Sequence, residues 1–218
     1  MTLNNISSDL PGYCLFPEYD SLYDLIALEV EELCDRALDF ESDKWQWSKW
    51  SIRYQLSHMA SLLYRWILIR WEGVVFSAGD HLVEDVKGLA DSGFDRRMDA
   101  EIYSDLDLIL EKLDEGIILV QQILKEYSID FLRTHSIAHE FSSQWTIMGK
   151  AHPVGLELAE GAKVGTISLE ATIRHMYYEE ITHLYNIQRL KRAQGLRAIV
   201  EIPRVGYWVQ KDWDRSEP

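Results

Sequence analysis

Hydrophobic residues recur at steps of three and four along four stretches of the chain, which is the period of an amphipathic α-helix. These stretches cover residues 21–40, 52–76, 99–126 and 168–194. Ser51 and Ser168 are suitable N-caps for the second and fourth helices, and Gly195 is a typical C-terminal stop. Four long helices joined by three connections predict an all-α protein that folds as a four-helix bundle.

The connections between these helices contain residues that interrupt regular structure. Residues 77–98 predict a loop with a weak helical piece near residues 82–89. Residues 128–166 hold Pro153 and four glycines, so they predict a long and irregular third connection.

The two ends of the chain also lack a sustained helical period. Residues 1–17 are rich in turn formers and predict an irregular arm. The tail, residues 196–218, alternates loosely over residues 199–208, which predicts a short extended segment. We therefore expect a single domain over residues 1–218, with the bundle core at about residues 20–195.

Charge and hydropathy narrow the choice of partners. The chain has 22 Lys and Arg against 36 Asp and Glu, which gives a formal net charge of −14. Phosphate binding needs a concentrated basic surface, so this balance argues against a nucleic-acid partner. The most apolar stretch, residues 59–76, is interrupted by Arg65, Arg70 and Glu72, which argues against a membrane span. We expect a small-molecule partner instead.

The N-terminus and the cysteines bear on the cellular compartment. Residues 1–10 are mostly polar, with neither the basic nor the apolar region of a signal peptide. The two cysteines, Cys14 and Cys34, offer no zinc-binding spacing and no disulfide framework. Reduced thiols in a cytoplasm are the simplest interpretation, so we predict a cytoplasmic protein.

The clearest chemical signal lies on the fourth predicted helix, where His175, Glu179 and His183 are spaced four residues apart. At about 100° per residue, such positions drift by only about 40° per step, so the three side chains share one face. An i, i+4 pair of ligand-type side chains can hold one metal ion in adjacent positions. Glu180 and His183 also have the Glu-x-x-His spacing of di-iron bundles, but the second helix lacks a matching motif.

The second predicted helix contributes one histidine, His58, within an otherwise apolar run. A lone histidine there fits a core residue with a hydrogen-bonded ring. It is also a candidate ligand, because the fourth helix offers a histidine and a carboxylate on one face. Two ligands from one helix and one from a facing helix would leave room for water or substrate, as in catalytic metal sites.

The remaining histidines are weaker candidates. His135 and His139 form a second His-x-x-x-His pair, but they lie in the irregular third connection, where a surface or loop pair is the favoured interpretation. His81 and His152 have turn-rich neighbours and no partner in the sequence, so we expect both at the surface.

Two segments carry a family pattern. Residues 45–59 (WQWSKWSIRYQLSHM) follow Trp-Ser-(apolar)-x-x-x-(apolar)-x-His-(apolar), at the opening of the second helix. Residues 179–187 (EEITHLYNI) are similar to His-x-x-x-His-x-x-Gln-Ile, on the last helix. Together they resemble the corresponding motifs of the DinB/YfiT-like superfamily, and the likeness covers roughly residues 20–195 in helix order and spacing.

The resemblance implies a four-helix bundle of DinB-like topology that holds one divalent metal through His58, Glu179 and His183. Glu179 stands where the family has a histidine, and Asn186 stands where it has a glutamine. Two histidines and a carboxylate suit zinc, nickel, iron or manganese, so the resemblance does not fix which of these metals is bound.

The resemblance also implies a metal-dependent hydrolase or a thiol-dependent transferase that uses a low-molecular-weight thiol. Such a metal lowers the pKa of a bound water or thiol and so generates a nucleophile. Glu180 or His175 would be the nearest additional acid or base, and a homodimer of the chain is among the expected partners. The alternatives are a metal-free helical interaction module, whose histidines are core residues, and a di-iron carboxylate bundle.

Overall fold

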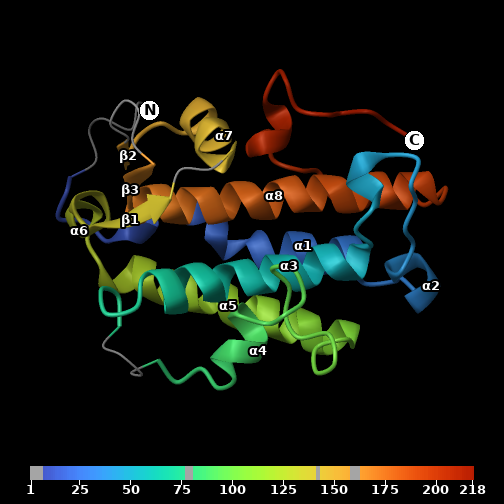
Figure 1. Cartoon of the computed structure of the whole chain (residues 1–218), viewed down its shortest axis with the longest axis horizontal. Coiled ribbons are helices and arrows are strands. Elements are labelled where there is room, and N and C mark those ends of the chain that lie inside the picture. The colour runs from blue at the N-terminus through green and yellow to red at the C-terminus, as the bar shows by residue number, and fades with distance from the viewer. Residues whose placement is uncertain (1–6, 77–80, 141–142, 158–162) are drawn as a thin grey trace.

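The computed structural model describes residues 7–76, 81–140, 143–157 and 163–218, and most of these residues are helical (Figure 1). The principal helices are α1 (Leu22–Val30), α3 (Ile52–Tyr64), α5 (Leu106–Glu126) and α8 (Leu169–Ala193). The helical class that the periodicity predicts is therefore confirmed. The expectation that the protein is purely helical is wrong, because a small sheet lies beside the N-terminal end of α8.

Helix α3 is the centre of the helical contacts, since it packs against both α5 and α8, while α1 packs against α5. Leu56, Met59 and Leu63 on α3 are completely buried in these interfaces. A glycine permits the close approach of α5, because a Cβ at Gly116 would lie 3.0 Å from Cδ1 of Leu63. The packing brings the two helices that carry the candidate ligands against each other.

Helix α8 ends close to where its sequence predicts. The hydroxyl of Ser168 accepts a hydrogen bond from the backbone N–H of Ala171 at 3.1 Å and so caps the first turn. Gly195 follows the last turn with a φ of 74°, a left-handed conformation that glycine adopts at little cost. Local chemistry at both ends therefore fixes the length of this helix.

Two other helices are shorter than the apolar period suggests. The first predicted helix ends at Val30 and resumes only as α2 (Asp35–Leu38). The third begins at Leu106 rather than near residue 99, because the side chain of Asp105 accepts hydrogen bonds from the first turn and caps it. The loop before it contains α4 (Val86–Ala90), and residues 77–80 of that loop lie outside the described residues.

The second predicted helix changes its winding partway along. Beyond Tyr64 it continues as a π-helical segment, Arg65–Arg70, closed by a hydrogen bond from the N–H of Trp71 to the carbonyl of Trp66 at 3.1 Å. Single π-helical turns are uncommon and often occur near functional sites. Here the segment lays the Trp66 ring against His175 of α8, with the ring centroids 5.2 Å apart.

The third connection is more ordered than its proline and glycine content predicts. It contains α6 (Ile129–Thr134), α7 (Ser143–Ala151) and the strands β1 (Ser136–Glu140), β2 (Leu156–Glu157) and β3 (Val164–Ser168). The strands form an antiparallel sheet in the order β1-β3-β2, with Ser136 opposite Ser168 and His139 opposite Gly165. Cross-strand hydrogen bonds stabilise this region, and they leave no trace in a local hydrophobic period. Residues 141–142 and 158–162 lie outside the described residues.

The chain beyond α8 runs back along that helix and lies on the same side of it as α7 (Figure 1). The extended segment predicted for residues 199–208 is not formed as a strand, and the chain has a 3₁₀ turn at Tyr207–Val209 instead. Its start is held by the buried carboxylate of Glu29, which accepts bonds from Lys191 at 2.6 Å and from the N–H of Val200 at 2.9 Å.

The N-terminal arm is irregular, as predicted, yet it is part of the core. It contains 3₁₀ turns at Gly12–Leu15 and Pro17–Asp20, and residues 1–6 lie outside the described residues. Phe16 and Tyr19 are 1 % exposed, so the arm covers one side of the helices. Within the described residues, no helix has the length and apolar character needed to cross a membrane.

Replacing Lys191 with methionine should destabilise the fold. The change leaves the carboxylate of Glu29 buried without its cationic partner, and breaking a buried ion pair costs about 3 kcal/mol. We expect a loss of that order in the free energy of unfolding, measured by urea denaturation. The exposed Lys211→Met variant is the control. Equal stability of both variants would mean that the Glu29–Lys191 pair does not anchor the C-terminal segment.

Candidate metal centre

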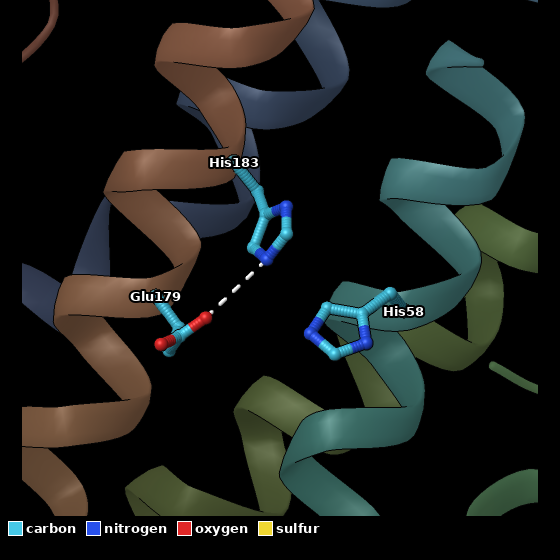
Figure 2. A group of neighbouring side chains, drawn as sticks. All are labelled: His58, Glu179 and His183. Carbon is cyan, nitrogen blue, oxygen red and sulfur yellow. Dashed lines mark ion pairs between the residues drawn. The ribbon is translucent and has the colours of Figure 1, made fainter. Parts of the chain in front are cut away.

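Three potential metal ligands from two helices meet between α3 and α8. One ligand atom from each of His58, Glu179 and His183 lies within 4.8 Å of the other two. Figure 2 shows the His58 ring reaching across from α3 toward the two α8 side chains, one helical turn apart. The structure thus brings together the three residues that the sequence analysis groups.

Hydrogen bonds behind the rings fix which nitrogen of each histidine faces the centre. Nδ1 of His183 lies against the Oε1 of Gln55, and Nδ1 of His58 lies 2.9 Å from the carbonyl oxygen of Arg96. Both oxygens accept hydrogen bonds, so both Nδ1 atoms carry the proton. In a neutral ring Nε2 then bears a lone pair, and such backing interactions orient histidine ligands in metal sites.

Burial and neighbouring charges keep His58 and Glu179 in the protonation states that metal binding needs. Burial, and then the proximity of His183, lowers the pKa of His58 well below its usual value, so its ring is neutral. For Glu179, burial acts to raise the pKa, but the hydrogen bond with His183 and the attraction of nearby histidines outweigh it and lower the pKa to about 2. Glu179 is therefore a carboxylate at neutral pH.

The contact between His183 and Glu179 requires a proton or a metal cation between the two side chains. Nε2 of His183 lies 3.4 Å from Oε2 of Glu179, the contact drawn as a dashed line in Figure 2. Two lone pairs at this distance repel unless a proton or a metal cation lies between them. A proton can bridge only Nε2 of His183 and Oε2 of Glu179. One metal ion can bind both of these atoms and also accept the lone pair of His58. The donor set of two imidazoles and one carboxylate suits a divalent metal.

The three side chains open into a pocket of about 200 Å³. Aromatic and aliphatic side chains form much of its wall: Trp50, Ile147, Met148, Tyr207 and Trp213. These residues come from the segment before α3, from α7 and from the C-terminal segment. The third connection (residues 128–166) and the tail (residues 196–218) therefore form part of the pocket wall. The candidate ligands themselves come from α3 and α8.

His175 lies in the same pocket, one helical turn before Glu179. It is 2 % exposed, and burial lowers its pKa to about 4, so its ring is neutral. Its Nδ1 lies 2.6 Å from the hydroxyl of Tyr207, and that hydroxyl also lies 3.0 Å from Nε2 of His152. A shared tyrosine hydroxyl thus joins two neutral histidines beside the centre.

His152 is not at the surface, contrary to the expectation from its turn-rich neighbours. It is 4 % exposed, and burial lowers its pKa to about 3. The bond to Tyr207 explains why a polar ring is placed there, since buried polar groups need partners.

Glu180 points away from the centre. Its side chain is completely buried, and among the described residues neither carboxyl oxygen has a hydrogen-bond partner. It is not part of the described lining of the pocket. Burial, with the charge of Glu179, raises the pKa of Glu180 well above its usual value, so it is a neutral acid in the core. The expected acid or base role of Glu180 therefore has no geometric basis, and its Glu-x-x-His spacing does not place it beside His183.

The second histidine pair is divided between different environments. His135 is exposed and stacks on Phe131 at 3.6 Å between ring centroids. His139 is buried on β1, and its Nδ1 accepts a hydrogen bond from Arg70 at 3.1 Å. The surface interpretation therefore holds for His135 and is wrong for His139. His81 is half-buried rather than fully at the surface.

Sequence reasoning missed three residues that support the centre: Gln55, Arg96 and Tyr207. Gln55 lies three positions before His58 on α3, so its helical spacing was a usable signal. Arg96 acts through its backbone carbonyl, from a loop in which its φ is 61°. Tyr207 reaches the site from the C-terminal segment. Neither of these two contacts follows from a local pattern.

Comparisons of the chain with protein-family models, with curated proteins and with solved structures find no match.

Replacing Gln55 with leucine should weaken metal binding without removing a ligand. The change leaves Nδ1 of His183 without its acceptor, and such losses typically lower metal affinity 10–100-fold. We expect that decrease in zinc affinity, measured by competition with a chromophoric chelator. Gln121→Leu, which removes an amide from α5 far along the sequence, is the control. Unchanged zinc affinity in Gln55→Leu would show that this bond does not orient the ligand.

The metal-free protein should lose stability as the pH falls from about 6.5 to about 4. The pKa of His175 is lowered to about 4 in the folded state from an ordinary value of 6.5. Between these values the unfolded chain takes up a proton that the folded chain does not, so acid favours unfolding. Each such histidine adds a slope of about 1.4 kcal/mol per pH unit.

Denaturation of His175→Gln across this pH range would test the assignment. In His175→Gln, the pH dependence of the free energy of unfolding should fall by about the contribution of one histidine. The exposed His135→Gln control should keep the wild-type pH dependence. An unchanged slope in His175→Gln would contradict the neutral, buried state of His175.

Proposed function

We propose that this chain binds one divalent metal ion through His58, Glu179 and His183, within a four-helix bundle of DinB-like topology. One observation carries the proposal: two imidazole lone pairs and a carboxylate converge between α3 and α8, while both Nδ1 atoms are occupied by oxygen acceptors. The second nitrogen of each ring faces a carboxylate or another histidine.

Zinc is the first candidate, and nickel, iron and manganese remain compatible with the same donors. Three protein ligands leave at least one coordination position free, which is the arrangement of catalytic sites. When bound, such a metal supplies an activated water or thiol. The adjoining pocket makes this position accessible to a small substrate.

The proposed activity is that of a metal-dependent hydrolase, or of a transferase that uses a low-molecular-weight thiol. The resemblance to the DinB/YfiT-like superfamily supports both. His175 is the acid or base candidate that the pocket offers, because it lines the cavity and Tyr207 orients its ring. Glu180 is not proposed for this role. The cytoplasmic location and the homodimer stay predictions.

The alternatives fit the described geometry less well. Among the described residues, this is the group of His, Cys, Asp and Glu side chains close enough to hold a metal, and it contains one carboxylate. A di-iron centre needs carboxylates from several helices. A metal-free interaction module needs a proton to bridge the 3.4 Å contact between His183 and Glu179, and it gives the inward-facing nitrogen of His58 no role.

Elemental analysis of untagged protein is the direct test. We expect close to one divalent metal per chain in the wild type after incubation with zinc, nickel, iron or manganese. His183→Ala should lower the affinity by more than about 100-fold, because loss of a ligand exceeds loss of its hydrogen-bonding partner. His135→Ala, which changes an exposed histidine, should keep the wild-type metal content.

A chelator should also lower the melting temperature of the loaded protein, since a ligand that prefers the folded state stabilises it. Full metal content in both His58→Ala and His183→Ala would place the metal elsewhere. A wild type that binds none of the four metals would favour the interaction module.

A further inference from the structure

The wall of the pocket beside the metal centre offers hydrogen-bond donors. Arg96 lines the pocket with its guanidinium 5.5 Å from the centroid of the Trp50 ring. Its nearest carboxylate is Asp95, at 3.5 Å, and both side chains are more than half exposed. Exposed ion pairs of this kind are weak, so the Arg96 cation remains able to bind a ligand.

Asn186 contributes a second donor with a defined orientation. Its Oδ1 accepts a hydrogen bond from the buried Arg189 at 2.6 Å. The oxygen therefore turns toward Arg189, and the amide NH₂ is left to the pocket that Asn186 lines. This is the position at which the family pattern has glutamine.

His175 contributes a third donor. The hydroxyl of Tyr207 has one proton and two histidine neighbours, so it donates to one ring and accepts from the other. In the described part of the chain, Nδ1 of His152 is buried without a partner. An orphaned N–H is rarer than an orphaned acceptor, so His152 carries its proton on Nε2 and donates it to Tyr207. The tyrosine then donates to Nδ1 of His175, which leaves an N–H at Nε2 of His175.

The acceptors around the pocket are engaged when the proposed metal centre is loaded. Thr182 donates its hydroxyl proton to the carbonyl of Tyr178 and accepts from the N–H of Tyr207 at 2.9 Å. Glu179 belongs to the metal centre. Nε1 of Trp213, another lining residue, is buried without a partner among the described residues. The described lining is therefore rich in N–H groups and short of free oxygens.

We propose that the pocket binds a small molecule through a carboxylate, which is held by Arg96, Asn186 and His175 beside the metal centre. A carboxylate supplies acceptors on two oxygens and a charge that complements the Arg96 cation. The flat aromatic walls and the volume of about 200 Å³ suit a small carboxylate on an apolar body. This site favours an anion even though the whole chain has a formal net charge of −14.

The proposal names the substrate class of the site proposed above and rests on that site. The carboxylate-binding donors themselves are protein groups, so they persist when the metal is removed. Carboxylate binding and metal binding can therefore fail independently in an experiment.

Benzoate, benzamide and phenyl phosphate are suitable probes, because they share one ring and differ in the polar group. Binding is measured by calorimetry with zinc-loaded and with chelator-treated protein, and checked by the fluorescence of the tryptophans. We expect benzoate to bind at least about ten-fold more tightly than benzamide to the zinc-loaded form, and with a smaller preference to the chelator-treated form, where the Glu179 carboxylate is uncompensated. Phenyl phosphate binding more tightly than benzoate would overturn the choice of carboxylate.

Two variants test the donors without touching a metal ligand. Arg96→Gln should weaken benzoate binding about ten-fold and leave benzamide unchanged, since one charge-assisted bond is lost. Asn186→Asp keeps an acceptor for Arg189 but replaces the NH₂ with a negative oxygen, so it should weaken benzoate binding at least as much. The exposed Arg36→Gln changes the net charge equally and should have no effect.

Equal affinities for benzoate and benzamide would overturn the proposal, and so would equal losses in Arg96→Gln and Arg36→Gln. If the wild type binds benzoate selectively but no metal, the carboxylate site stands and the metal centre fails. If the wild type binds metal but shows no preference for benzoate over benzamide, the metal centre stands and the carboxylate site fails.

Discussion

The close approach of two imidazole rings and a carboxylate in the space between α3 and α8 is the constraint on which the rest of the site depends. The lone pairs face inward because an oxygen acceptor stands behind each ring: the Gln55 amide for His183 and the Arg96 carbonyl for His58. Those two acceptors come from a helix and from a distant loop. Several parts of the fold are therefore needed to present one small set of donors.

Burial makes this arrangement effective and also costly. Burial strengthens each electrostatic contact, and it keeps His58, His175 and His152 neutral by penalising their charged forms. A neutral imidazole can donate a lone pair to a metal. The hydrogen-bond partner of its other nitrogen fixes which of the two nitrogens carries the proton. The same burial raises the pKa of Glu180, one residue from the candidate ligand Glu179. Adjacent glutamates on one helix thus have opposite protonation states, because one faces the centre and the other faces the core.

The cover of the pocket ties the irregular parts of the chain to the site. α7 and the C-terminal segment lie along α8 and contribute Met148 and Trp213 to the wall (Figure 1). Hydrogen bonds from Lys191 and from the N–H of Val200 to the Glu29 carboxylate hold the start of the C-terminal segment, residues 196–218, in place. Part of the pocket wall consequently comes from segments that carry none of the candidate metal ligands.

The sequence by itself determined the helical class, the ends of α8 and the grouping of His58, Glu179 and His183. These features depend on short-range chemistry: the helical period, a serine cap, a terminal glycine, and side chains one turn apart. Only the tertiary structure decided that β1 pairs with β3, that His152 is buried and that Glu180 faces the core. It also decided which nitrogen of each histidine faces the centre. Strand pairing, burial and the acceptors behind a ring involve residues far apart in the chain, and no local pattern encodes contacts of that range.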